Sequence, residues 1–156
     1  WGLGVNCPEP ILQALDVADP DVFLLASQYS LIDHQYALDH IFPAVRARNV
    51  SLVMGSPLNA GFLSGSDRYN YDDGIPAGYK EKRARLTAIA EAHGVTLRTA
   101  ALQFASMPDV TATVIPGART ALQITEDAES MNVEIPHEFW AELKSEGLVA
   151  QNAPTG

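Results

Sequence analysis

The sequence predicts an α/β domain built on a parallel sheet, and three observations indicate this fold class. Four short runs are nearly continuously apolar, which is typical of parallel strands buried on both faces. Segments with helical spacing separate these runs, as expected for parallel strands joined by crossover helices. The chain has 156 residues, 47% of them hydrophobic, which is enough for one domain with its own core. The expected strands are residues 3–6, 22–27, 51–56 and 112–117.

Six segments between and after these strands have helical patterns. Thr96 and Thr120 stand where an N-cap is expected, and Gly94 stands where a helix ends. Asp33 is a further possible cap, and Pro43 must either bend its helix or interrupt it. The expected helices cover residues 8–18, 33–49, 78–94, 96–107, 120–132 and 136–147.

The longest connection covers residues 59–79 and is rich in Gly, Asn, Asp and Tyr. Its length and its position after the third strand indicate a functional loop. Tyr69, Tyr71 and Tyr79 could line a polar substrate or fold over a cofactor, and simple packing explains them equally well.

The two ends of the chain indicate how far the domain extends. The chain begins at Trp1 and enters a strand-like run at once, so we expect it to be part of a longer protein. We expect the domain to cover residues 1–148 and residues 149–156 to form a tail, disordered over its last six residues.

Composition excludes several classes of partner. The formal net charge is −9 and there is no basic patch, so nucleic acid and anionic membranes are not expected partners. The apolar runs are too short to span a bilayer. The single cysteine, Cys7, cannot form an internal disulfide, which favours a reducing compartment such as the cytoplasm.

Two architectures fit four parallel strands, a small open sheet and part of an eight-stranded β/α barrel. In both, binding sites form at the carboxyl ends of the strands. A flavodoxin-like open sheet needs a phosphate loop after the first strand, where Pro8 and Pro10 remove backbone donors. The loop that follows the fourth strand leads into a helix start, which is either an anion site or a plain capped turn.

Three segments, "GLGVN", "GSPLNAGFLSG" and "TLRTAALQFASMPDVTATVIPGARTALQITED", together resemble the C-terminal half of the aldo-keto reductases. The similarity covers about residues 2–143, and its most specific parts are the turn at 56–63 and the segment at 115–126. The resemblance implies a parallel β/α (TIM-type) barrel of which this chain supplies strands five to eight. "GVN" and "QYSLID" are most similar in style to the aldose and fucose dehydrogenase branch.

The resemblance also implies a nicotinamide cofactor, NAD or NADP, and assigns positions to it. Asn6 and Gln28 fall near the nicotinamide, the turn that begins at Ser56 covers the pyrophosphate, and the segment after Gly117 lies at the adenosine end. The implied cofactor-binding residues are Asn6, Gln28, Ser56, Leu58, Asn59, Gly61, Gly117, Arg119, Thr120, Gln123 and Asp127.

Several positions depart from the family pattern. Gly55 stands where many members carry an aromatic residue that stacks on the nicotinamide. Gly117 and Gln123 replace a lysine and an arginine that bind the 2′-phosphate of NADP, and Asp127 places a carboxylate nearby. These changes favour NAD over NADP, whereas Arg119, as a possible partner of the 2′-phosphate, favours NADP.

No residues match the family's catalytic tyrosine, aspartate, lysine and histidine, so we expect no catalytic residue in this chain. Tyr36 and His40 lie four apart and are expected to be ordinary helix neighbours. No set of residues converges as a metal site. We therefore expect the cofactor-binding half of an oxidoreductase that acts on a small carbonyl or sugar, inactive alone. The alternative is a non-catalytic half-barrel module that forms a homodimer.

Overall fold

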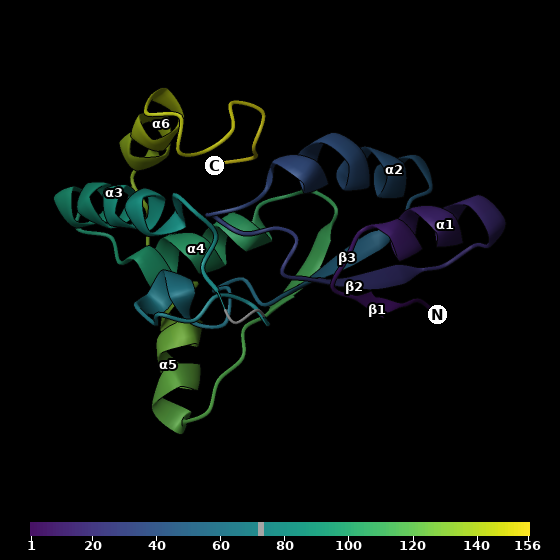
Figure 1. Ribbon diagram of the computed structural model, residues 1–156, viewed down its shortest axis with the longest axis horizontal. Coiled ribbons are helices and arrows are strands. Elements are labelled where there is room, and N and C mark those ends of the chain that lie inside the picture. The colour runs from purple at the N-terminus through teal and green to yellow at the C-terminus, as the bar shows by residue number, and fades with distance from the viewer. Residues whose placement is uncertain (72–73) are drawn as a thin grey trace.

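A four-stranded parallel sheet forms the centre of the molecule (Figure 1). The structure, a computed structural model, describes residues 1–71 and 74–156. Neighbouring strands in the sheet are also consecutive in sequence, and every pair is parallel, which confirms the predicted fold class. The strands are β1 (Gly4–Val5), β2 (Val22–Ala26), β3 (Ser51–Gly55) and β4 (Thr111–Ile115).

The predicted helices are all present, with ends within a few residues of the expected bounds. Thr96 accepts a hydrogen bond from the N–H of Thr99, and Thr120 accepts one from Gln123, so both predicted caps are confirmed. The helices are α1 (Glu9–Val17), α2 (Phe42–Ala47), α3 (Tyr79–Ala92), α4 (Leu97–Ser106), α5 (Ala121–Ser130) and α6 (His137–Ser145).

Pro43 interrupts the second helical segment through a change of helix type. The turn before it, η1 (Ala37–Ile41), is a π-helix, and the N–H of Phe42 donates to the carbonyl of Ala37, five residues earlier. A proline in a regular α-helix removes one backbone donor and collides with the carbonyl four residues before it. The wider π turn relieves this conflict next to the first turn of α2. Asp33, predicted as a cap here, instead accepts a hydrogen bond from the hydroxyl of Tyr79 at 2.9 Å.

Helices α1 and α2 cover one face of the sheet, and the opposite face is open (Figure 1). Phe23, Leu25 and Met54 point to the covered face and are fully buried. Leu24 and Ile115, of alternate parity along their strands, remain 36% and 49% exposed. The outer edges of β1 and β4 pair with no further strand among the described residues.

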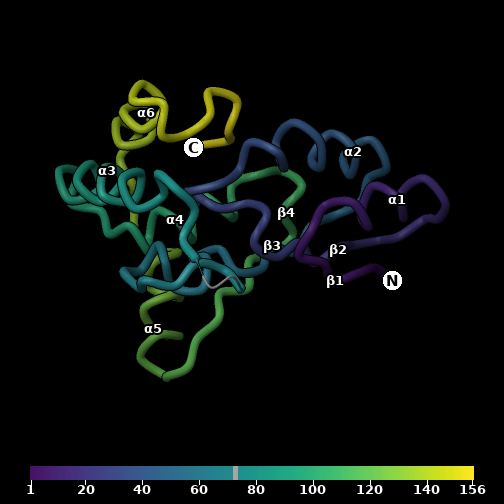
Figure 2. The backbone as a smooth tube through the Cα atoms, viewed as in Figure 1, coloured from purple at the N-terminus to yellow at the C-terminus, as the bar shows by residue number. Residues whose placement is uncertain are grey.

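The segment after α6 packs against the domain, which differs from the predicted disordered tail. Val149 and Ala153 are buried, and the Lys144 ammonium donates to the carbonyl of Ala153 at 2.9 Å. Apolar side chains at the two buried positions and this hydrogen bond order the segment. The chain begins beside β1 and ends near α6 (Figure 2). Within the described ranges, no helix is both long enough and apolar enough to cross a membrane.

Candidate functional site

A cavity of about 720 Å³ lies at the carboxyl ends of β3 and β4. Two loops form its walls, the one that follows β3 and the one that joins β4 to α5. The carboxyl edge of a parallel sheet is where α/β proteins bind ligands. Eight of the residues singled out from the sequence line it: Ser56, Leu58, Gly61, Gly117, Arg119, Thr120, Gln123 and Asp127.

The loop after β3 turns sharply and leaves backbone donors at the cavity. Ser56, Ala60 and Gly61 have φ values of 55°, 57° and 93°, in the left-handed region. The turn is closed by hydrogen bonds such as that from the N–H of Gly61 to the carbonyl of Leu58. The N–H groups of Leu58 and Ala60 donate to no acceptor within the described part of the chain. Two unused donors beside a cavity suit an anionic ligand.

Asn59 does not line the cavity and instead ties the start of the loop to its middle, at Asn70. Its side chain is fully buried, and its Nδ2 donates to Oδ1 of Asn70 at 2.9 Å. The N–H of Asn70 donates to the carbonyl of Asn59 at 3.3 Å. The contacts of Asn59 are therefore those of a residue that holds the loop closed.

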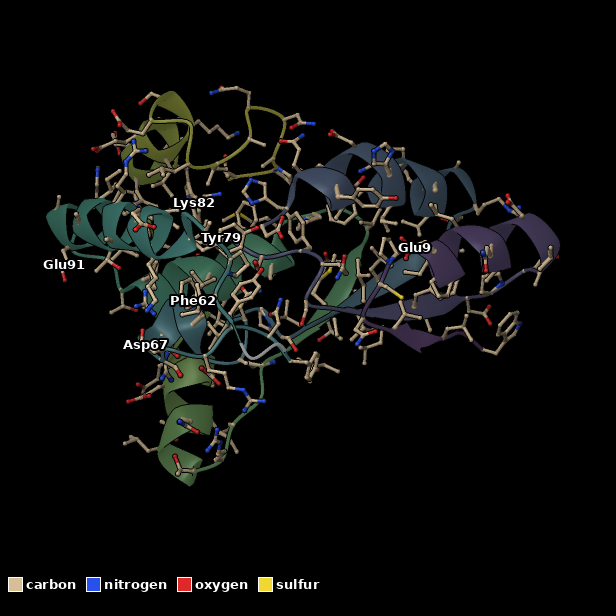
Figure 3. The ribbon with its side chains drawn as sticks, viewed as in Figure 1. Glu9, Phe62, Asp67, Tyr79, Lys82 and Glu91 are labelled. Carbon is tan, nitrogen blue, oxygen red and sulfur yellow. The ribbon has the colours of Figure 1, made fainter. Side chains whose placement is uncertain are left out.

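Arg83 of α3 fixes the middle of the same loop. Its guanidinium lies 4.3 Å from the centre of the Phe62 ring, in η2 (Phe62–Ser64). It also donates to the carbonyl of Ser66 at 2.7 Å and to Asp67 at 3.3 Å. Phe62, Asp67 and Tyr79 lie at the α3 end of the molecule, away from Glu9 on α1 (Figure 3). The loop is thus attached to a helix and not only to the sheet.

The three loop tyrosines have different environments. Tyr69 is buried, and its ring packs edge-on against Phe62 at 5.6 Å and Tyr79 at 5.3 Å between ring centres. Burial and the hydrogen bond to Asp33 raise the pKa of Tyr79 above its ordinary value. Tyr71 is 66% exposed. Packing therefore explains Tyr69 and Tyr79. Asp72 and Asp73 of the same predicted loop lie outside the described residues.

The second wall is a capped helix start. Thr120 caps α5, and Oε1 of Gln123 accepts a hydrogen bond from the N–H of Arg119 at 2.7 Å. This reciprocal arrangement fixes the backbone of the turn and holds Gln123 against its own loop. The guanidinium of Arg119 has no partner among the described residues and lines the cavity.

Arg98, on α4, was not singled out from the sequence but lines the cavity and pairs with Asp127, which also lines it, and with Glu126, which does not. Its Nη1 lies 2.7 Å from Glu126 and 3.3 Å from Asp127, whose side chain is only 7% exposed. The Asp127 carboxylate is therefore paired, but it shares Arg98 with Glu126, so the electrostatic penalty that the sequence suggested for a phosphate is reduced and not removed.

Sequence reasoning also missed Ser64, Ser66 and Arg68, which come from the loop after β3 and line the cavity. The concentration of Gly and Ser around a lone arginine in "SGSDR" was a signal for a polar ligand wall. Nothing in the local pattern reveals that this arginine faces the segment after β4.

Asn6 and Gln28 form a separate contact. The side chain of Gln28 donates to the carbonyl of Asn6 at 2.8 Å, and each residue follows its strand at the carboxyl edge of the sheet. Neither residue lines the 720 Å³ cavity. They are therefore on the same edge of the sheet as the cavity but are not part of its wall.

Gly55 is closely packed against the neighbouring strand. A Cβ atom at this position would lie 3.2 Å from Cβ of Ala26 and 3.2 Å from Cδ2 of Leu24. An aromatic side chain here would require both Leu24 and Ala26 to move, and Cα of Ala26 lies 3.3 Å from the added Cβ. Leu24 and Ala26 thus occupy the space next to Gly55, where many family members carry an aromatic side chain.

The cavity offers groups that can bind an anion. Its described lining contains three arginines, several hydroxyl groups, backbone donors and the Asp127 carboxylate, and no Tyr, His, Lys or Cys. Tyr36 and His40 do lie close together, at 4.5 Å between ring centres, as helix neighbours away from this site. Among the described residues, no group of three or more His, Cys, Asp or Glu could hold a metal ion.

Comparison with known proteins gives a consistent match over nearly the whole chain. A pyridoxal 4-dehydrogenase of Microbacterium luteolum is 35% identical over 154 residues, which cover 96% of this chain and 44% of that protein. A D-threo-aldose 1-dehydrogenase of a Pseudomonas species is 31% identical, with 95% of this chain and 46% of that protein covered. The chain thus spans about half the length of these curated relatives.

Solved structures give the same picture for the fold. An aldo-keto reductase from Bacillus halodurans, in its holo form, superposes with a TM-score of 0.68 at 24% identity, over 95% of this chain and 49% of that one. Its apo form gives a TM-score of 0.66 at 23% identity, over 91% and 48%. The sheet therefore matches about half of a β/α barrel. Residues 4–146 match the sequence pattern of the Aldo/keto reductase family, and the chain belongs to that family.

Proposed function

We propose that this chain is the C-terminal, cofactor-binding half of an NAD(P)-dependent oxidoreductase, with β1 to β4 as strands five to eight of its barrel. The cavity at the ends of β3 and β4 is the observation that carries the proposal. A hydroxyl group, two unused backbone donors and the start of α5 converge on it, together with arginine side chains. Such a set suits the diphosphate and adenosine portions of a dinucleotide.

In this proposal the nicotinamide supplies the hydride chemistry, and this chain places the cofactor. Asn6 and Gln28 lie nearest the nicotinamide end, and the turn from Ser56 to Gly61 covers the diphosphate. Gly117, Thr120 and the first turns of α5 border the adenosine. The groups that move the proton lie in the remaining part of the barrel, so the 156 residues alone catalyse little or nothing.

NAD is the favoured cofactor. Gly117 offers no cation at the adenosine end, and Gln123 is held in a hydrogen bond to the N–H of Arg119. Arg98 is shared between Glu126 and Asp127 and so reduces the repulsion by the Asp127 carboxylate without removing it. Arg119, whose guanidinium has no partner among the described residues, favours NADP and makes the preference for NAD a small one.

The substrate is a small carbonyl or alcohol, with a sugar such as an aldose as the first candidate. One curated relative is named for an aldose and the other for pyridoxal, and both are dehydrogenases. An aldose and pyridoxal each contain an aldehyde and a hydroxyl group that can add to it. Each can therefore present the enzyme with a cyclic hemiacetal.

A direct test titrates the chain with NADH for binding and assays it, with NAD⁺ as the hydride acceptor, for oxidation of aldoses. We expect NADH to bind, and we expect a Ser56→Ala variant to bind it several-fold more weakly because a hydroxyl donor at the phosphate is lost. Ser145→Ala, at the end of α6, is the matched control and should bind as the unaltered chain does. Absence of NADH binding would contradict the proposal, and rapid turnover by the 156 residues would contradict the location of the catalytic groups.

A second candidate is a non-catalytic half-barrel that dimerises. The open sheet edges, the exposed Leu24 and Ile115, and an apolar groove of about 450 Å³ between β4 and α5 favour it. Pairing β4 of one copy with β1 of another would close a barrel with all strands parallel. Sedimentation velocity measures whether the chain dimerises, and titration with NADH and NADPH measures cofactor binding. A tight dimer that binds neither cofactor would favour the module.

A further inference from the structure

The apolar groove between β4 and α5 lies on the helix-covered side of the sheet. Its volume is about 450 Å³. Val114 lines it from the strand, on the same face as its register partner Met54, which is fully buried. Ile124, Ala128 and Met131 line it from one side of α5. Ile124 and Met131 are 61% and 45% exposed, so much of this apolar surface faces solvent.

The outer edge of β1, at the other end of the sheet, carries apolar side chains that point to the same side. Val5 pairs with Leu25, which is fully buried on the covered face, and Leu3 has the same parity as Val5. The carbonyl of Leu3 accepts a hydrogen bond from the N–H of Leu24 at 2.9 Å, so Leu3 continues the strand. One edge of the sheet therefore has an apolar groove, and the other has apolar side chains on the matching face.

The two edges and the open face between them are surfaces that closure of the sheet would bury together. The outer edges of β1 and β4 pair with no further strand within the described ranges, and an unpaired edge is a template for another strand. Leu24 pairs with Val53, and both point to the open face with Ile115. Apolar side chains of this kind fill the interior of a closed β/α barrel.

Two copies of this chain supply the number of strands that closure needs. A β/α barrel has eight parallel strands, and each copy has four. About a two-fold axis, β4 of each copy would pair with β1 of the other, with every strand parallel and every covered face outside. The solved structure in its holo form, of which this chain covers 49%, is also about two copies long. In this arrangement Leu3 and Val5 of one copy point towards the groove of the other.

We propose that the 156-residue chain forms a two-fold dimer in which Leu3 and Val5 of each copy pack into the β4–α5 groove of the other. The inference rests on the half-barrel assignment in the proposed function and names the surface by which the half-barrel closes. Among the described residues that line the groove, Asp127 alone is charged, and it pairs with Arg98. The contact between the copies is therefore largely apolar, and its burial drives association.

Sedimentation velocity in about 0.15 M salt tests the inference, because this salt screens most of the repulsion between two chains of net charge −9. We expect the unaltered chain to be a dimer at micromolar concentration. Leu3→Lys and Ile124→Glu each place a charge in the apolar contact and should weaken dimerisation about tenfold or more. Tyr36→Glu, at a 46% exposed ring between β2 and β3, is the matched control and should remain dimeric.

A mixture of the two altered chains distinguishes the proposed pairing from other dimers. A mixed dimer contains one unaltered contact and one in which the introduced lysine faces the introduced glutamate. We therefore expect Leu3→Lys and Ile124→Glu to dimerise with each other far more tightly than either does alone. A dimer that joins groove to groove would survive Leu3→Lys, and that result would overturn the inference.

Titration of the same samples with NADH separates the inference from the proposed function. A folded monomer that binds NADH would overturn the dimer and leave the proposed function intact. A dimer that dissociates in both variants but binds no NADH would support the inference and contradict cofactor binding. Species that grow in size with concentration would show open-ended pairing of β4 with β1 and would overturn two-fold closure. Circular dichroism of each variant checks that folding is unchanged.

Discussion

The imidazole of His34 accepts a hydrogen bond from the backbone N–H of Ala150, at 3.1 Å and 116 residues later in the chain. Its other nitrogen, Nδ1, lies 2.9 Å from the carbonyl of Ser30. Since a carbonyl can only accept and an N–H can only donate, the ring must be neutral, with its proton on Nδ1. His34 therefore attaches the segment after α6 to the loop after β2 only while it is uncharged.

We expect the domain to lose stability as the pH falls from about 6.5 to about 4. Burial, followed by the nearby Lys82, lowers the pKa of His34 from 6.5 to about 4, against smaller opposing effects that include Asp33. The unfolded chain therefore takes up the proton before the folded one. Stability from this group is complete above pH 6.5, and on the order of 3 kcal/mol is lost by pH 4.

Urea unfolding between pH 4 and pH 7.5 measures this loss. A His34→Gln variant removes the titrating group and should flatten that part of the profile, whereas His137→Gln, which alters an exposed ring, should leave it unchanged. Equal slopes for His34→Gln and the unaltered chain would contradict the assignment.

Removal of the Tyr29 hydroxyl is expected to stabilise the domain. The ring is 1% exposed and stacks on Phe104 at 4.9 Å, and its hydroxyl has no hydrogen-bond partner within the described residues. Burial raises the pKa of Tyr29 well above its ordinary value, so the group stays protonated and neutral. Tyr29→Phe removes an unsatisfied polar atom while the ring remains, and should raise the free energy of unfolding by about 1 kcal/mol.

Thermal and urea unfolding of Tyr29→Phe provide the measurement. Tyr36→Phe, at a 46% exposed ring, is the control and should change little. A clear loss of stability in Tyr29→Phe would mean that the hydroxyl has a favourable partner after all.

The elements that depend on local sequence were predictable, because their signals lie within a few residues. The apolar runs identified all four strands, and Thr96 and Thr120 identified two helix starts. The π turn before Pro43 was predicted only as a disturbance, since sequence gives the conflict and not the way in which the backbone resolves it.

The candidate site was predicted in part, for a similar reason. Residues that follow strands are expected at one edge of a parallel sheet, and Ser56 and Arg119 do line one cavity. Arg98 and Arg68 reach it from α4 and from a long loop, and no periodicity encodes such contacts. The burial of Ala153 escaped prediction because it depends on a surface formed by distant elements.

Removal of Arg98 should destabilise the domain and weaken anion binding together. In Arg98→Met, the Asp127 carboxylate remains buried without its partner, which should cost about 3 kcal/mol. Adding Asp127→Asn removes that charge and should recover part of the loss. A double-mutant cycle by urea unfolding gives the coupling between the two residues. Independent, additive effects would show that the ion pair contributes little.

Asn59 should contribute to stability through its backbone conformation as well as through its side-chain amide. With φ at 50°, an alanine would be strained by about 1 kcal/mol, and loss of the amide bond to Asn70 should cost about 1 kcal/mol more. Asn59→Gly loses the same hydrogen bond but accommodates the backbone, so Asn59→Ala should be the less stable variant. Asn49→Gly, at φ 53° on the exposed turn after α2, is the control and should be near neutral. Because Asn59 holds the loop that lines the cavity, both Asn59 variants should also bind NADH more weakly than the unaltered chain does. An unchanged affinity for NADH in a destabilised Asn59→Ala would show that cofactor binding does not depend on this loop contact.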